Sequence, residues 1–276
     1  MRPTRSPSVL FGALVLAALA LAALAAPLLH TVDPVLLTPR LRLKPPTADH
    51  WFGTDGFGRD LWSRVIYGAR ISLAIGAMVS VVAVVLGLAI GLGAGFVRWL
   101  DGPVMRVMDG IMAIPAILLA IAMVSLNGAG LMTVAVAIVI PEVPRVARLV
   151  RSVVLSVREE PYVEAAIGLG TRLPLLLWRH ILPNTLAPLA VQGTYVAASA
   201  ILTEAILSFL GAGIPTEIPS WGNAMAEGRV YFQIAPWIIL FPGLCLAVTV
   251  LAVNLLGDGL RDLLDPRLAK SVRNFR

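Results

Sequence analysis

The sequence predicts an all-α integral membrane protein with six transmembrane helices and a short helix pair at one membrane face. Of its 276 residues, 58% are hydrophobic and only 14% are charged, whereas about 25% of residues are charged in an average soluble domain. The mean hydropathy is +0.86, and the apolar residues form runs of about 20, the length that crosses ~30 Å of hydrocarbon as a helix. The net charge of +6 comes largely from Arg residues at the ends of these runs, which is typical of membrane topology rather than of nucleic-acid binding.

The first apolar run covers residues 9–29 and follows Arg2 and Arg5. It is rich in Ala and Leu and longer than the usual core of a signal peptide, so we expect an uncleaved helix. Its Ala-Leu-Ala repeats would also suit a signal peptidase, and cleavage would leave the topology of the rest unchanged. Residues 1–70 are therefore predicted to form this helix and a polar loop on the outer face.

The polar loop, residues 30–70, contains four Pro residues in its first half and turn-forming Gly residues in its second. Asp60 is placed to cap a helix from Leu61, which we expect to lie in the membrane interface. The acids near His50 offer a metal site as an alternative, but turns and caps explain them equally well. No histidine pair has a ligand spacing such as HExxH, and the single Cys245 allows no thiolate cluster, so we predict no metal.

Apolar periodicity and length predict five further spans. They cover residues 71–97, 104–126, 131–150, 185–210 and 237–257. Pro115 is expected to kink the third span, and Pro141 and Pro144 to distort the fourth. The transmembrane domain is thus placed at residues 71–260, and residues 261–276 form a basic tail.

Three glycines, Gly87, Gly91 and Gly95, recur at every fourth position of the second span. This spacing places them on one helix face, where small residues let two membrane helices approach closely. The alternative is that Gly is simply common in membrane helices. We predict a helix-packing face.

Residues 151–184 are a charged interruption between the fourth and fifth spans. Pro161 suits the first position of a short helix, and Gly168 and Gly170 supply the freedom that a tight turn needs. Thr171 is placed to cap a second helix, which Pro183 is expected to end. A helix, a glycine turn and a second helix are therefore predicted, held at one membrane face by two spans.

Within this segment, Glu164-Ala165-Ala166 is followed after three residues by Gly170 and, after nine further residues, by His180-Ile181-Leu182-Pro183. This order resembles the EAA loop of ABC importer permeases. His180 stands where the family pattern has Ile, and the Arg179–Asn184 variant looks like the dipeptide, oligopeptide and nickel branch. The resemblance extends from roughly Trp51 to Leu268.

The resemblance implies a type I ABC importer permease-like fold in which this helix pair is the cytoplasmic coupling segment. It also implies that partner ATPase subunits bind the segment and rock the spans between outward- and inward-facing states. The residues implied in ATPase coupling are Glu164, Ala165, Ala166, Gly170, Arg172, Arg179, His180, Leu182 and Pro183. For the Arg residues, contact with lipid headgroups is an equally good interpretation.

The chain has no nucleotide site of the P-loop type, because neither of its lysines, Lys44 and Lys270, follows a glycine. We therefore expect no catalytic residue and no cofactor here, with ATP and Mg bound by separate subunits. The resemblance implies two ATPase subunits, a second homologous permease and an extracytoplasmic binding protein that docks on residues 30–70 and 212–235. Trp51, Trp62, Trp221 and Tyr231 are docking candidates, although an aromatic belt is the commoner explanation.

Charge distribution predicts which face is cytoplasmic. If both termini and residues 151–184 are inside, 15 of the 22 Lys and Arg residues are inside and 7 outside, as the positive-inside rule requires. Six of those seven lie in the first outer loop and run against the trend. The expected location is the bacterial inner membrane, with both termini cytoplasmic.

Two other functional classes are weighed against the importer. An ion-coupled transporter needs ionisable groups at mid-membrane; Glu142 and Glu204 are candidates, but no inverted repeat surrounds them. An intramembrane enzyme needs a nucleophile with a base or a liganded metal, and no GxSxG or HExxH is present. Glu204 is kept as a packing, pore or gate candidate. The substrate is expected to be a small peptide, with a nickel- or glutathione-type permease as the alternative.

Overall fold

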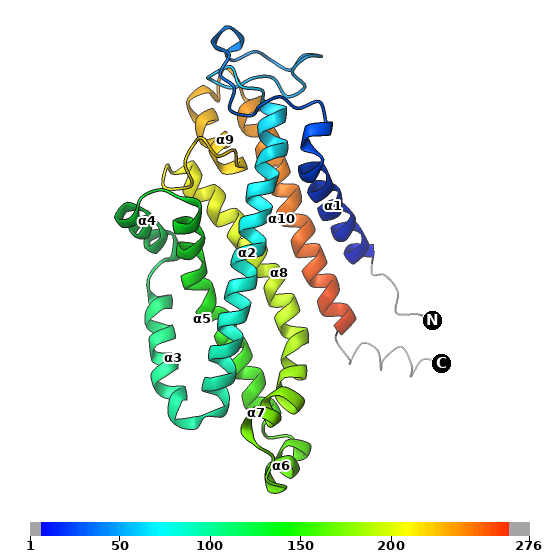
Figure 1. The fold of residues 1–276 in the computed structure, drawn as a ribbon, viewed down its shortest axis with the longest axis vertical. Coiled ribbons are helices and arrows are strands. Elements are labelled where there is room, and N and C mark those ends of the chain that lie inside the picture. Colours follow the sequence, from blue (N-terminus) through cyan, green and yellow to red (C-terminus); the bar gives the residue numbers. More distant parts are fainter. Residues whose placement is uncertain (1–6, 265–276) are drawn as a thin grey trace.

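The computed structural model describes residues 7–264, which form an elongated bundle of helices (Figure 1). An all-α fold is thereby confirmed for this part of the chain. The α-helices are α1 (Pro7–Leu24), α2 (Leu61–Phe96), α3 (Arg98–Ala113), α4 (Ala116–Asn127), α5 (Leu131–Val157), α6 (Pro161–Gly168), α7 (Leu173–Leu176), α8 (Leu182–Phe209), α9 (Trp221–Gly228) and α10 (Trp237–Leu264). Most of the predicted tail, residues 261–276, lies outside the described residues, as do Arg2 and Arg5.

Among residues 7–264, three helical segments are long and apolar enough to cross a membrane by themselves: Leu61–Phe96, Leu173–Phe209 and Trp237–Leu264. A fourth is added if α3 and α4 are taken as one broken span. The first helix is apolar but shorter, and α5, at 27 residues, carries one Glu and three Arg. Six spans therefore remain a prediction.

The helix that begins at Leu61 is not the separate interfacial helix that the sequence suggested. It is the start of the 36-residue α2, and Leu61, Val65 and Ile66 are buried in the protein instead of facing lipid. The predicted cap is confirmed, because the Asp60 carboxylate accepts a hydrogen bond from the Ser63 amide. A capped start followed by apolar residues without a helix breaker lets the helix continue directly into the membrane span.

The third predicted span, residues 104–126, is two helices whose axes differ by 83°. The break falls at Ile114 and Pro115, which have extended ψ angles of 125°. A proline disfavours the helical conformation of the residue before it, so the expected kink becomes a full corner. Residues 98–103, predicted as a turn, are the first residues of α3.

α2 and α5 pack along a seam of glycines and valines. A Cβ atom added to Gly87, Gly91 or Gly95 would lie 2.5 to 2.8 Å from the Cβ of Val146, Val150 or Val154. The three glycines therefore face α5 in register, and each fits opposite one valine. Close approach of the two backbones is possible only because these positions lack a side chain.

We expect Gly91→Ala to destabilise the bundle by about 1–3 kcal/mol, because the added methyl would overlap Val150 and the Ala147 carbonyl oxygen. Gly93 on the same helix is the matched control, since a Cβ there meets no atom within 4 Å. Gly93→Ala should stabilise the helix by roughly 0.5–1 kcal/mol. Thermal unfolding in detergent measures both; equal shifts would contradict the packing seam.

Candidate functional site

The predicted coupling segment lies at one end of the bundle, and the loop before α2 lies with α9 at the opposite end (Figure 1). α6 begins at Pro161, as predicted. On α6, Val163 and Ala166 are buried against Leu176 of α7 and form a small apolar cluster, while Glu164 and Ala165 are exposed. The segment therefore has its own small core and presents one face outward.

The chain leaves α6 through a Schellman turn. Gly170 has φ +76°, its amide donates to the Ile167 carbonyl at 2.9 Å, and the Thr171 amide donates to the Ala166 carbonyl at 3.1 Å. This pair of bonds requires a left-handed residue after the helix, the conformation that glycine adopts without strain. No atom lies within 4 Å of a Cβ added to Gly170, so conformation alone demands the glycine.

The second helix of the segment does not end at Pro183, contrary to the prediction. α7 passes through a π-helical turn, Leu177–Ile181, directly into α8. Pro183 stands in the first turn of α8, where a missing N–H costs little. Thr171 was also expected to cap the second helix, but Arg172 occupies that position and makes no side-chain cap bond.

The residues around the π-helical turn connect α8 to α6. The Asn184 amide donates to the Tyr162 hydroxyl at 3.2 Å and to the His180 carbonyl at 2.7 Å, and the Tyr162 and His180 rings lie 6.1 Å apart. Arg172 and Arg179 are exposed. Departures from α-helical geometry of this kind are frequent at functional sites.

The arginines of α5 are paired with acids. Arg151 Nη2 donates to Asp101 Oδ2 of α3 at 2.6 Å. Arg148 forms an ion pair with Asp109 of α3. Arg145 binds Glu142, whose carboxylate also accepts from Ser199 of α8 at 3.0 Å. The sequence placed Glu142 close to Arg145, but it gave no sign of the acids on α3 that pair with Arg148 and Arg151.

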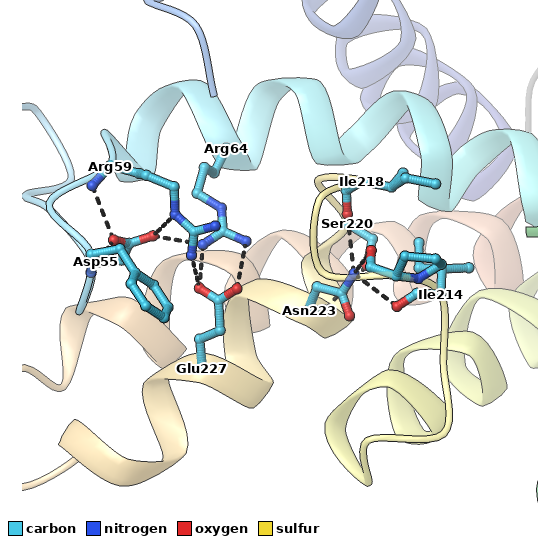
Figure 2. A network of polar contacts seen from close by, with 10 residues as sticks. Asp55, Arg59, Arg64, Ile214, Ile218, Ser220, Asn223 and Glu227 are labelled. Atoms are coloured by element: carbon cyan, nitrogen blue, oxygen red, sulfur yellow. Dashed lines mark hydrogen bonds and ion pairs between the residues drawn. The ribbon is translucent and has the colours of Figure 1, made fainter. Parts of the chain in front are cut away.

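At the other end of the bundle, four charged residues form a buried cluster (Figure 2). We call Asp55, Arg59, Arg64 and Glu227 the charge quartet. Arg59 Nε and Arg64 Nη1 donate to Asp55 Oδ2 at 2.7 and 2.6 Å, and Arg64 Nη2 donates to Glu227 Oε1 at 3.2 Å. Both guanidinium groups also contact Glu227 Oε2. The quartet joins the loop before α2, α2 itself and α9, and its formal charges cancel.

Burial by itself would raise the pKa of Asp55. The guanidinium groups of Arg64 and Arg59 and the amides of Arg59 and Phe57 outweigh that effect and hold this pKa below its usual value. Asp55 therefore stays ionised and keeps both arginines paired. The sequence interpretation treated Asp55 as one of the acids near His50 that serve turns or caps, with a metal site as the alternative, and did not pair it with Arg59 or Arg64.

α9 is held at its other end by polar contacts around Glu204. Ser220 caps α9 by accepting from the Asn223 amide, and its hydroxyl donates to Glu204 Oε1 at 3.0 Å. Glu204 is completely buried and also accepts from Ser208 at 2.9 Å. It faces no surface of this chain, so any effect on a gate would act through the packing of α9.

The prediction that Trp221 contacts a docked binding protein is wrong. Trp221 is completely buried, and its indole N–H donates to the Val65 carbonyl of α2 at 3.0 Å. Trp51, in contrast, is half-exposed on the outer loop. Tyr231 accepts a hydrogen bond from Arg42 of that loop.

A family model described as the binding-protein-dependent transport system inner membrane component matches residues 83–270. A probable peptide ABC transporter permease protein from Sinorhizobium fredii is 61% identical over 95% of this chain and 90% of its own length. A dipeptide transport system permease protein from Alkalihalophilus pseudofirmus is 44% identical over 93% of this chain and 85% of its own length.

A glutathione transport system permease protein from Pectobacterium atrosepticum is also 44% identical, over 81% of this chain and 74% of its own length. Among solved structures, an inward-facing MetNI methionine ABC transporter aligns with a TM-score of 0.61 at 19% identity. That alignment covers 73% of this chain and 97% of the other. At this identity the likeness concerns the fold alone.

Proposed function

Because this chain belongs to the binding-protein-dependent transport system inner membrane components, we propose that it is the permease subunit of an ATP-driven importer that carries small peptides across the bacterial inner membrane. The substrate class follows the relatives, whose names specify peptides, dipeptides and glutathione. A glutathione-type permease is the second candidate, favoured by the 44% identity to such a protein.

The proposed topology has six spans, with α3 and α4 together forming the third. Both termini and the coupling segment then share the cytoplasmic side. In support, the start of α1 and the end of α10 point toward the end of the bundle that carries α6 (Figure 1). The loop before α2 and the α9 region are placed outside, where a binding protein would dock.

The proposed coupling element is the exposed face of α6 with the turn that follows. Glu164 and Ala165 lie on that face, and Leu169 beside the turn is 87% exposed, an apolar surface that favours a protein partner. A turn of three residues, 158–160, joins α5 to α6, and α7 continues through the π-helical turn into α8. A push on this segment would therefore reach two long helices without crossing a flexible linker.

In this mechanism the chain performs no chemistry. Separate ATPase subunits bind ATP and Mg and move the coupling segment, and α5 and α8 follow. A second homologous permease supplies the other half of the pore. In this chain, α2 and α5 would move as one body because they are packed along the glycine seam. Gly87, Gly91 and Gly95 would thus help to transmit the movement of the coupling segment from α5 to α2.

Membrane vesicles that contain the whole importer test this function. Uptake of a labelled dipeptide should require both ATP on the coupling-segment side and the loaded binding protein. A pH gradient imposed without ATP should give no more uptake than vesicles that lack the permease. Uptake driven by the gradient alone would instead favour the ion-coupled class and direct attention to Glu142 and Glu204.

A further inference from the structure

Three basic residues of the outer loop, Arg40, Arg42 and Lys44, are exposed, and none forms an ion pair with an acid among residues 7–264. They lie within five residues of one another, at the end of the bundle that also carries α9 (Figure 1). We call them the basic patch. Their position is unexpected, because loops outside a membrane are usually poor in Lys and Arg.

The other basic residues of this loop have structural partners. Arg59 and Arg64 belong to the buried charge quartet. Arg70 donates to the Ala23 and Leu24 carbonyls at the end of α1, where a positive charge complements the helix dipole. Folding therefore accounts for these three arginines and leaves the basic patch unexplained.

The backbone beneath the basic patch is fixed. The Lys44 amide donates to the Thr54 hydroxyl at 2.9 Å, and the Thr54 amide donates to the Lys44 carbonyl at 3.0 Å. Leu43 has φ +54°, and its amide donates to the Asp55 carbonyl at 3.1 Å, next to the charge quartet. A charged surface that is ordered before binding loses little conformational entropy when a partner arrives.

Arg42 also connects the patch to the α9 region. Its guanidinium donates to the Tyr231 hydroxyl at 2.6 Å and lies 5.4 Å from the centre of that ring. The loop and the segment after α9 therefore present one continuous surface.

Exposed apolar side chains border the basic patch. Leu36 and Leu37 precede it in sequence, and the backbone of Gly58, next to Phe57, lies against the Thr38 carbonyl. Leu37, Phe57 and Val230 are each more than half exposed. Apolar residues with charges at the margin are the usual composition of a protein interface. Among residues 30–60, the exposed acids are Asp33 and Asp49.

We propose that the basic patch is the contact that receives an acidic surface of the extracytoplasmic binding protein. This inference rests on the proposed function and adds that the binding protein must carry acidic residues where it contacts the basic patch. Charges at the margin of an interface act mainly on the rate of encounter. Loss of the patch should therefore raise the concentration of binding protein needed and leave the maximal turnover unchanged.

The test uses the complete importer in lipid nanodiscs and the loaded binding protein as the probe. Binding-protein-stimulated ATP hydrolysis is measured against binding-protein concentration at low and high salt. For Arg40→Glu with Lys44→Glu, we expect the half-maximal concentration to rise roughly 10- to 100-fold at low salt, with the same maximal rate. High salt should reduce this difference, because salt screens exposed charges. Arg42 is left unchanged to preserve its contact with Tyr231.

The matched control keeps the charge at both positions, Arg40→Lys with Lys44→Arg, and should behave as the unchanged protein. An equal loss in this control, or an unchanged half-maximal concentration in the charge-reversed variant, would overturn the proposal. The same holds if the effect is present only with anionic phosphatidylglycerol and absent with phosphatidylcholine, since the patch would then bind lipid headgroups. An unmodified importer that shows no ATP-dependent uptake at all would instead refute the proposed function.

Discussion

Replacing Gly170 by valine should leave the protein inserted in the membrane but abolish ATP-driven uptake. Gly170 has φ +76°, which a β-branched residue adopts only at a cost of order 1–3 kcal/mol. A valine would favour another conformation and break the two turn bonds that set the direction of the chain after α6. Because 1.4 kcal/mol corresponds to a factor of ten, this cost alone would lower the population of the native turn roughly 5- to 150-fold, and uptake should fall with it.

Asparagine provides the matched control at this position. Asn tolerates the left-handed conformation better than other non-glycine residues, and a side chain at Gly170 meets no neighbour within 4 Å. Gly170→Asn should therefore retain most of the uptake. The amount of ATPase subunit that co-purifies with each variant shows whether a loss of uptake reflects a loss of docking.

Glu164→Lys tests the same contact by charge. Glu164 is exposed in the first turn of α6, where a carboxylate suits the positive end of the helix. A lysine would disfavour α6 locally and reverse the charge offered to the ATPase, while the bundle stays intact. Normal uptake in a protein that carries both Gly170→Val and Glu164→Lys would refute this coupling assignment.

Sequence reasoning was most successful where a signal is local. The start of α6 at Pro161 and the cap at Asp60 depend on residues within one helical turn. The corner at Pro115 was also located correctly. Pro183 shows the limit of such rules, because a proline in the first turn of a helix is tolerated there and need not end the helix before it. Here α8 starts at Leu182.

The long-range contacts were not predictable from one sequence. Glu227 lies 163 positions from Arg64, and Glu204 lies 16 positions from Ser220. Neither spacing carries a periodic signal, so Arg64 and Glu204 were interpreted without these partners. The unusual number of arginines in the outer loop was the one available sign, since buried acids are the usual way to neutralise buried arginines.

Arg64→Met should lower stability by about 3–5 kcal/mol, the usual cost of breaking a buried ion pair by removing one partner. The Arg64 side chain is 1% exposed and contacts Asp55 and Glu227, so its loss would leave the buried Asp55 and the partly buried Glu227 with Arg59 as their one basic partner in the quartet. At roughly 2–4 °C per kcal/mol for a protein of this size, the apparent melting temperature in detergent should fall by about 10 °C. Arg229→Met, at an exposed position just after α9, should change it by less than about 2 °C.

A double-mutant cycle separates the ion pair from simple loss of packing. If Arg64 stabilises the fold through Glu227, then Glu227→Gln should cost less in the Arg64→Met background than alone, with a coupling of about 0.5–3 kcal/mol. Additive effects would contradict the pairing. The result also bears on function, because α9 is fixed to α2 through the quartet at one end and to α8 through Glu204 at the other. A coupled quartet would mean that a binding protein docked on the outer loop presses on a surface rigidly joined to α2, the helix that packs against α5 and so leads toward the coupling segment.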